Sequence, residues 1–168
     1  MGEAIIARRG GGNNIKSIQR GTLTTSTTTQ NITIALVDLN SAVLIITGVE
    51  GSGSDAGYSV SAKLTSPTNI EFKCAYYAGA TVSWQVVEFN NVKSLQRGTS
   101  TLKSSGTDIA IAEINLSKSI LVTNFRSSGT GAGYTGYSYH AKLTTNTNIN
   151  ARSTTSNGHL EWQVVEFK

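Results

Sequence analysis

Histidine is the side chain best suited to act as a general base near neutral pH, and the chain has only two, His140 and His159. Nucleophilic catalysis needs such a base beside a nucleophile, and a third group that orients the base. His140 lies in an alternating stretch and His159 follows a Ser-Asn-Gly turn, so we interpret both as surface residues. The spacings HxH, HExxH and CxxC are absent. We expect no catalytic residue, no metal site and no cofactor.

Paired carboxylates could cleave a glycosidic bond, and the acids available for this are Asp38, Asp55, Glu71, Glu88, Asp108, Glu113, Glu161 and Glu166. Glu88 and Glu166 stand out because each lies in an otherwise apolar Trp-Gln-Val-Val-Glu-Phe strand. A buried carboxylate needs a partner. Two Gln-Arg-Gly motifs offer Arg20 for Glu88 and Arg97 for Glu166. We predict two structural ion pairs rather than an active site, because an acid required for one reaction rarely has to occur twice.

Glycine-rich segments occur at residues 51–57 and 127–133. A phosphate-binding loop would be followed by Lys-Ser or Lys-Thr and by a helix. Neither follows here, so we interpret both segments as loops that join strands or make contacts.

The chain repeats itself. Residues 15–22 return as 92–99, Ala-Lys-Leu-Thr returns 79 positions later, and the tryptophan-containing block returns 78 positions later. Self-similarity of this kind indicates duplicated structural units. We therefore predict an N-terminal extended arm at residues 1–14 and two homologous repeats at residues 15–89 and 92–168.

Each repeat has the pattern of short β-strands. Residues 32–37 and 43–46 are β-branched runs, and residues 58–65 alternate, with Tyr58, Val60, Ala62 and Leu64 on one face. Residues 69–74 alternate as well. In the second repeat the same pattern places Tyr137, Tyr139, Ala141 and Leu143 inward. Such spacing is typical of sandwiches or barrels. We predict an all-β chain of two tandem antiparallel β-sandwiches without a convincing helix.

The tryptophan-containing strand is apolar on both faces, which indicates a central strand or one covered by another subunit. Trp84 and Trp162 lie at equivalent positions in it, and burying an indole contributes strongly to a small core. We expect both tryptophans to be structural. Because a sandwich of this size has a thin core, we also expect a homo-oligomer.

Composition limits the remaining classes of function. Charged residues make up 14% of the chain and the net charge is +4, but the basic residues do not cluster, so we expect no nucleic-acid binding. The sequence has no apolar run long enough for a transmembrane helix, and we expect no membrane insertion. Cys74 is the only cysteine, so no disulfide can form within the chain.

The first residues belong to neither repeat. They contain an apolar stretch with Ile5 and Ile6, then Arg8 and Arg9, then three glycines. The basic pair follows the apolar stretch, which is the wrong order for a signal peptide. We expect this arm to anchor the protein to a neighbour.

The blocks Lys-Ser-[Ile/Leu]-Gln-Arg-Gly-Thr and Trp-Gln-Val-Val-Glu-Phe, in both repeats, resemble small β-sandwich virion proteins of tailed bacteriophages of Gram-positive bacteria. The residues that open the chain resemble the leader of such proteins. The family is in turn similar to the H-type lectin-like sandwich, which assembles around an axis, so the resemblance implies a trimer or a hexamer. The resemblance implies a structural protein of the tail, fibre, baseplate, head or neck, made in the host cytoplasm and located in the virion. Its partners would be other copies of itself, other virion proteins through the arm, and a host surface glycan.

The sequence leaves three functions open. The first is the virion structural protein, the second is a lectin-like adhesin that binds host cell-wall polysaccharide, and the third is a depolymerising enzyme. We favour the first and expect no enzymatic activity.

Overall fold

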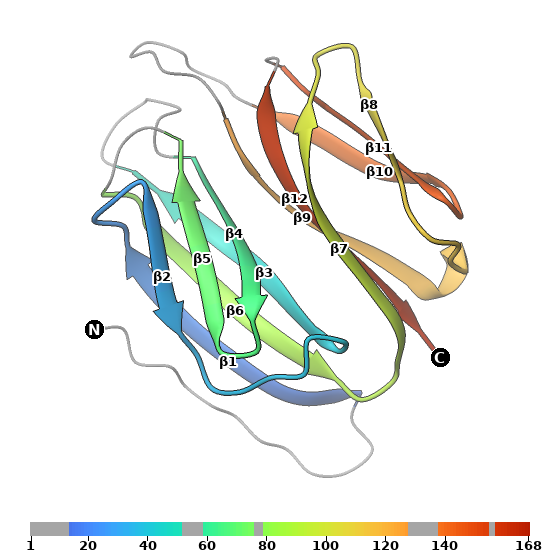
Figure 1. The fold of residues 1–168 in the computed structure, drawn as a ribbon, viewed down its shortest axis with the longest axis horizontal. Helices are drawn as coiled ribbons and strands as arrows, with labels where there is room; N and C mark the ends of the chain where they lie inside the picture. The colour runs from blue at the N-terminus through green and yellow to red at the C-terminus, as the bar shows by residue number, and fades with distance from the viewer. Residues whose placement is uncertain (1–13, 52–58, 76–78, 128–137, 155–156) are drawn as a thin grey trace.

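The computed structural model describes residues 14–51, 59–75, 79–127, 138–154 and 157–168, and this part of the chain is all-β (Figure 1). Its first six strands are β1 (Ile15–Thr24), β2 (Thr29–Thr33), β3 (Ala42–Glu50), β4 (Val60–Ser66), β5 (Asn69–Cys74) and β6 (Thr81–Phe89). The next six are β7 (Val92–Leu102), β8 (Thr107–Ala110), β9 (Ser119–Arg126), β10 (Tyr139–Thr145), β11 (Asn148–Ser153) and β12 (Gly158–Phe167). One short 3₁₀ helix, η2 (Leu116–Lys118), precedes β9.

The strands form four antiparallel sheets of three strands each. Residues 15–89, the first half, contain the sheets β1-β6-β3 and β2-β5-β4; residues 92–168, the second half, contain β7-β12-β9 and β10-β11-β8. The strand order is thus the same in both halves. Figure 1 shows the two halves side by side, each with its sheets layered face to face.

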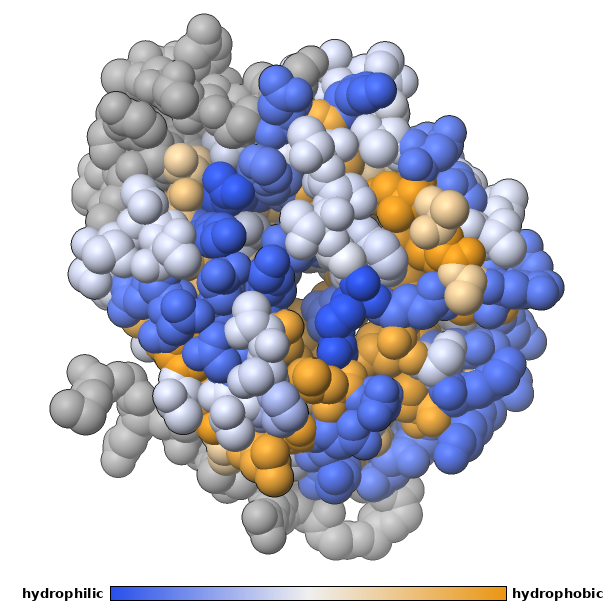
Figure 2. Space-filling model, in the orientation of Figure 1, coloured by the Kyte–Doolittle hydropathy of each residue, from blue (hydrophilic) through white to orange (hydrophobic). Residues whose placement is uncertain are grey.

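Each half has its own apolar core. In the first half β5 alternates as the sequence predicts, with Ile70, Phe72 and Cys74 buried between the sheets. In the second half the core includes Ile149 and Leu160. Figure 2 shows that hydrophobic residues also reach the surface in patches.

A tryptophan lies over a glycine in each half. Gly21 pairs with Trp84 across β1 and β6, and a Cβ atom added to this glycine would lie 2.5 Å from Cζ2 of the indole. Gly98 has the same relation to Trp162 across β7 and β12. The glycine of each Gln-Arg-Gly motif therefore gives the ring the space it occupies. Trp84 is 5% exposed, and Trp162 is partly buried against the second core.

Two sequence expectations differ from the structure. The expected strand at residues 32–37 is β2 (Thr29–Thr33), because the chain then crosses from one sheet to the other. Ile34 and Val37 are buried in that crossing, where their N–H groups donate to the carbonyls of residues 68 and 67. Tyr139, expected inside, is 37% exposed, because it lies in β10, an edge strand of its sheet.

The arm with Ile5, Ile6, Arg8 and Arg9 lies outside the described residues, and so do Tyr58, Tyr137 and most of both glycine-rich segments.

Candidate functional site

Glu88 is a buried carboxylate at the end of β6. Its Oε1 accepts hydrogen bonds from Lys16 Nζ at 2.7 Å and from the N–H of Asp38 at 3.0 Å, and its Oε2 accepts one from Ser17 Oγ at 3.0 Å. Burial raises the pKa of Glu88, but these hydrogen bonds outweigh burial and hold the pKa below its ordinary value. The charged carboxylate thus joins β1, β6 and the segment before β3.

Glu166 has the same arrangement in the second half. Lys93 Nζ and the N–H of Asn115 donate to its Oε1 at 2.9 and 3.0 Å, and Ser94 Oγ donates to its Oε2 at 3.1 Å. These hydrogen bonds, the one from Lys93 above all, hold the pKa of Glu166 below its ordinary value. Both carboxylates have every oxygen engaged, which suits a structural role.

The expected ion pairs with Arg20 and Arg97 are wrong. Arg20 pairs with Gln85 in the ladder, and Glu88 lies three residues further along β6. Successive side chains of a strand point to opposite faces, so Arg20 and Glu88 lie on opposite faces of the sheet. The Nε of Arg20 donates instead to Gln85 Oε1 at 3.3 Å. In the second half Arg97 pairs with Gln163, three residues before Glu166, so Arg97 and Glu166 also lie on opposite faces of their sheet.

The two halves meet where one sheet packs on the edges of two others. The outward face of β7-β12-β9, here called the docking face, carries Arg97, Asn124 and Gln163. It packs against β3 and β4, the neighbouring edge strands of the two sheets of the first half, here called the covered edge.

Side-chain amides form the most specific contacts of this interface. Gln163 accepts from the N–H of Leu44 at 3.0 Å and donates to the carbonyl of Leu44 at 2.6 Å. Asn124 does the same with Ala62, at 2.8 and 3.0 Å. Each amide thus pairs with an edge strand as a neighbouring strand would. The outward backbone groups of β3 and β4 that would otherwise be unpaired at these positions are satisfied.

Further contacts join the halves beside the pair of Gln163 and Leu44. Arg97 donates to the carbonyls of Leu39 and Ala42 at 2.7 and 3.0 Å. Burial lowers the pKa of Arg97, while the charge of Asp38 raises it. The rings of Phe89 and Phe167 meet edge to face with centroids 5.3 Å apart.

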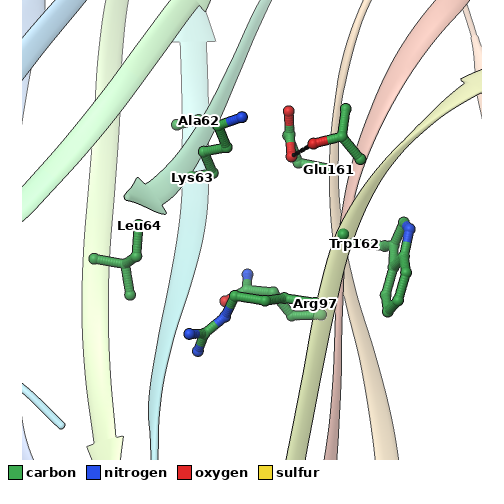
Figure 3. Close-up of a pocket in the computed structure, with 9 residues that line it drawn as sticks. Ala62, Lys63, Leu64, Arg97, Glu161 and Trp162 are labelled. Atoms are coloured by element: carbon green, nitrogen blue, oxygen red, sulfur yellow. Dashed lines mark hydrogen bonds between the residues drawn. The ribbon is translucent and has the colours of Figure 1, made fainter. Parts of the chain in front are cut away.

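A small cavity of about 70 Å³ lies within this interface (Figure 3). It is lined by Ala62, Lys63 and Leu64 of the first half and by Arg97, Gly98, Thr99, Glu161, Trp162 and Gln163 of the second. Glu161 is its only acid, and burial raises the pKa of that carboxyl, although a hydrogen bond from Thr99 at 2.6 Å opposes the shift. Ligand pockets usually enclose about 300–1,000 Å³, so the cavity is too small for a sugar. It also lacks the second carboxylate that glycoside cleavage requires.

A comparison of the chain with models of known protein families, with curated protein sequences and with solved structures found no match in any of the three. Within the described ranges no group of three or more His, Cys, Asp and Glu side chains is placed to hold a metal ion. No helix of that same part is long and apolar enough to cross a membrane.

A larger and more polar hollow of about 240 Å³ lies on the second half, at one end of β10 and β11. Its lining is Ser104, Ser138, Tyr139, His140, Arg152, Ser153 and Thr154. His140 and Arg152 are paired across the two strands, and both are exposed. Tyr139 stacks on Phe125 with ring centroids 5.0 Å apart. The hollow therefore offers cationic and hydroxyl groups beside an aromatic ring.

His159, the other histidine of the sequence, is half-buried near the docking face. Burial and the neighbouring charges of Arg126 and Lys73 lower its pKa below the ordinary value. Sequence reasoning missed Asn124 and Gln163 as contact residues. The signal for Gln163 was a lone amide in an apolar strand, but Gln85 occurs in an identical block.

Proposed function

We propose that the chain consists of two tandem copies of one antiparallel β-sandwich, and that it is a self-assembling structural protein of a bacteriophage virion. Three features support the duplication: the recurring sequence blocks, the shared strand order and the matching surroundings of Glu88 and Glu166. The sequence resemblance supports the phage particle as the location. In this proposal the protein has no catalytic activity.

One observation carries the structural role. The docking face of one sandwich binds the backbone of two strands of the other, through Gln163 and Asn124, rather than a particular set of side chains. A module that binds the backbone of its own kind is suited to building an assembly. The proposed assembly is a trimer or a hexamer, and the arm with Ile5, Ile6, Arg8 and Arg9 would dock it to another virion protein.

The composition of the particle tests this function. Particles purified from the phage or prophage that encodes the chain are analysed by mass spectrometry and by cryo-electron microscopy. We expect the chain at a defined copy number and as repeating β-sandwich density at one site of the particle. Its absence from infectious particles would refute the proposal.

The polar hollow favours a second candidate, a lectin-like adhesin. Hydroxyl-rich ligands bind through hydrogen-bonding side chains beside an aromatic face, and the hollow combines Tyr139, His140 and Arg152. The test is binding to host cell-wall polysaccharide on a glycan array. Arg152→Ala should abolish binding, and Lys142→Ala, an exposed cation of the same strand pair that does not line the hollow, should not. Absence of binding by the wild-type chain would remove this candidate.

A further inference from the structure

The edge that is covered in the first half has an open equivalent in the second. The strand register makes Ile120 the counterpart of Val43, because they pair with Val165 and Val87, which lie 78 positions apart. Val43 is fully buried, whereas Ile120 is 43% exposed. By the same register Tyr139 matches Val60, and their exposed fractions are 37% and 2%.

A third residue is likewise exposed in the second half while its counterpart in the first half is less exposed. Asn115 and Asp38 both donate their N–H to the buried glutamate of their half, so the next residues, Leu116 and Leu39, are counterparts. Leu116 is 46% exposed, and Leu39 is partly buried against the first core. Three of the five large hydrophobic residues exposed in the described part of the chain thus lie on the open edge, formed by β9, β10 and η2.

The first half has the matching face. One end of it is already occupied within the chain, because Phe89 contacts Phe167 and because Val43 and Val87 are 0% and 6% exposed. The side chains of Arg20 and Gln85 on this face are at least partly exposed. The outward face of β1-β6-β3, here called the open face, carries Arg20 and Gln85 at the positions of Arg97 and Gln163. On the docking face these two side chains bind the backbone of the covered edge. On the open face they contact each other, in an exposed hydrogen bond of 3.3 Å.

Net charge favours the same pairing. Residues 15–89 contain four Lys and Arg against five Asp and Glu, a net of −1; residues 92–168 contain eight against four, a net of +4. Contact between a first half and a second half therefore joins opposite net charges, whereas contact between two second halves does not.

We propose that the open edge of one chain binds the open face of a second copy of the same chain, and so repeats between chains the interface that joins the halves within one. This inference deepens the proposed self-assembly by naming its surfaces. Gln85 of one chain then pairs with the backbone of Leu121 of its neighbour, the counterpart of Leu44. Arg20 donates to the carbonyls of Leu116 and Ser119, the counterparts of Leu39 and Ala42.

The proposed interface is head-to-tail, because it uses two different surfaces of each chain. Such contacts produce a closed ring, or a filament when the rotation does not close. The pairing between chains lacks two contacts of the internal interface. The ring of Phe89 already contacts Phe167 of its own chain, so it is not free to take the place of Phe167. The bulge in β3 places Gly48 opposite Ser83, where the second half has Asn124 opposite Glu161. We therefore expect it to be weaker than the interface within the chain.

Two variants and their mixture test the proposal. Arg20→Glu with Gln85→Ala blocks the open face, and Ile120→Lys blocks the open edge; all three side chains are at least partly exposed, so the fold should persist. Masses are measured by light scattering at about 100 μM chain, above the dissociation constants of standard-size interfaces. Circular dichroism checks that each variant is folded.

The wild-type chain should give one ring mass or a concentration-dependent series of larger masses, and each variant alone should be a monomer. Mixed in equal amounts, the variants should form a dimer, because each still has one intact surface. A wild-type monomer, variants that oligomerise as the wild type does, or a mixture that stays monomeric would each overturn the proposal. The light-scattering assay uses the purified chain and tests only the proposed interface. A negative result there would leave the virion role standing if particles contain the chain. Particles without the chain would refute the virion role and leave a measured interface standing.

Discussion

Replacing Gln163 by alanine should lower the stability of the protein. The amide of Gln163 satisfies both the N–H and the carbonyl of Leu44, whose side chain is fully buried. Leaving a buried polar group without a partner costs about 1–3 kcal/mol, so two such groups set an upper range of about 2–6 kcal/mol. Water can enter beside Gln163 through the adjoining cavity and restore part of this loss. We expect the free energy of unfolding to fall by about 2–4 kcal/mol.

The matched control is Gln85→Ala. Gln85 lies at the equivalent position of an identical sequence block, but its only side-chain partner among the described residues is Arg20, in an exposed hydrogen bond. Exposed polar contacts of this kind contribute about 0–1 kcal/mol, so in the monomer this variant should unfold nearly as the wild type does.

Urea unfolding followed by tryptophan fluorescence and circular dichroism measures both variants, at a chain concentration where light scattering gives a monomer. Hydrogen exchange gives a local readout, because the N–H of Leu44 should exchange faster in Gln163→Ala and unchanged in Gln85→Ala. Equal stabilities of the two alanine variants, with Leu44 still protected in both, would show that the amide does not hold the halves together.

Three further predictions concern single side chains. Gly21→Ala should lower the free energy of unfolding by about 1–3 kcal/mol, because its Cβ would lie 2.5 Å from the Trp84 ring; Gly48→Ala, with no atom within 4 Å of the added Cβ, is the control in the same urea titration. Glu161→Gln should stabilise the protein by about 1 kcal/mol at pH 7. Burial raises the pKa of Glu161, so the stability of the wild type falls as pH rises through that pKa. The gain in stability of Glu161→Gln over the wild type should therefore vanish in urea titrations below the ordinary value of 4.5. A gain that does not depend on pH would contradict a raised pKa for Glu161. Glu88→Gln should remove part of the loss of stability that the protein shows in acid. The pKa of Glu88 is lowered, so the stabilisation from its charge is present above 4.5 and is lost as pH falls through the pKa in the folded state. Identical profiles of stability against pH for the variant and the wild type would refute the role of this charge.

The core of each half could be predicted from the sequence because alternation depends only on neighbouring residues. Ile70, Phe72 and Cys74 follow it directly. The identity of the partner of Glu88 could not be predicted, because it depends on which residue of β1 lies opposite. The bulge between Ile15 and Ser17 sets that register, and the sequence gives no sign of it.

The interface between the halves was beyond sequence reasoning for a different reason. Gln85 and Gln163 occupy identical blocks, yet one is half-exposed and the other joins the halves. The difference arises from which face the neighbouring half covers. Tyr139 illustrates the same limit, because its position matches that of buried Val60 while its surroundings do not.

Because side-chain amides pair with the edge strands, the sheets of the two halves do not join into one continuous twisted sheet. Had the edge strand β9 paired directly with β3, one sheet would run through both halves, and each added strand would contribute about 20–25° of twist. Gln163 and Asn124 satisfy the same backbone groups without extending any sheet beyond three strands. Each half therefore keeps its own curvature beside the other, because the twist of one sheet is not carried into the next.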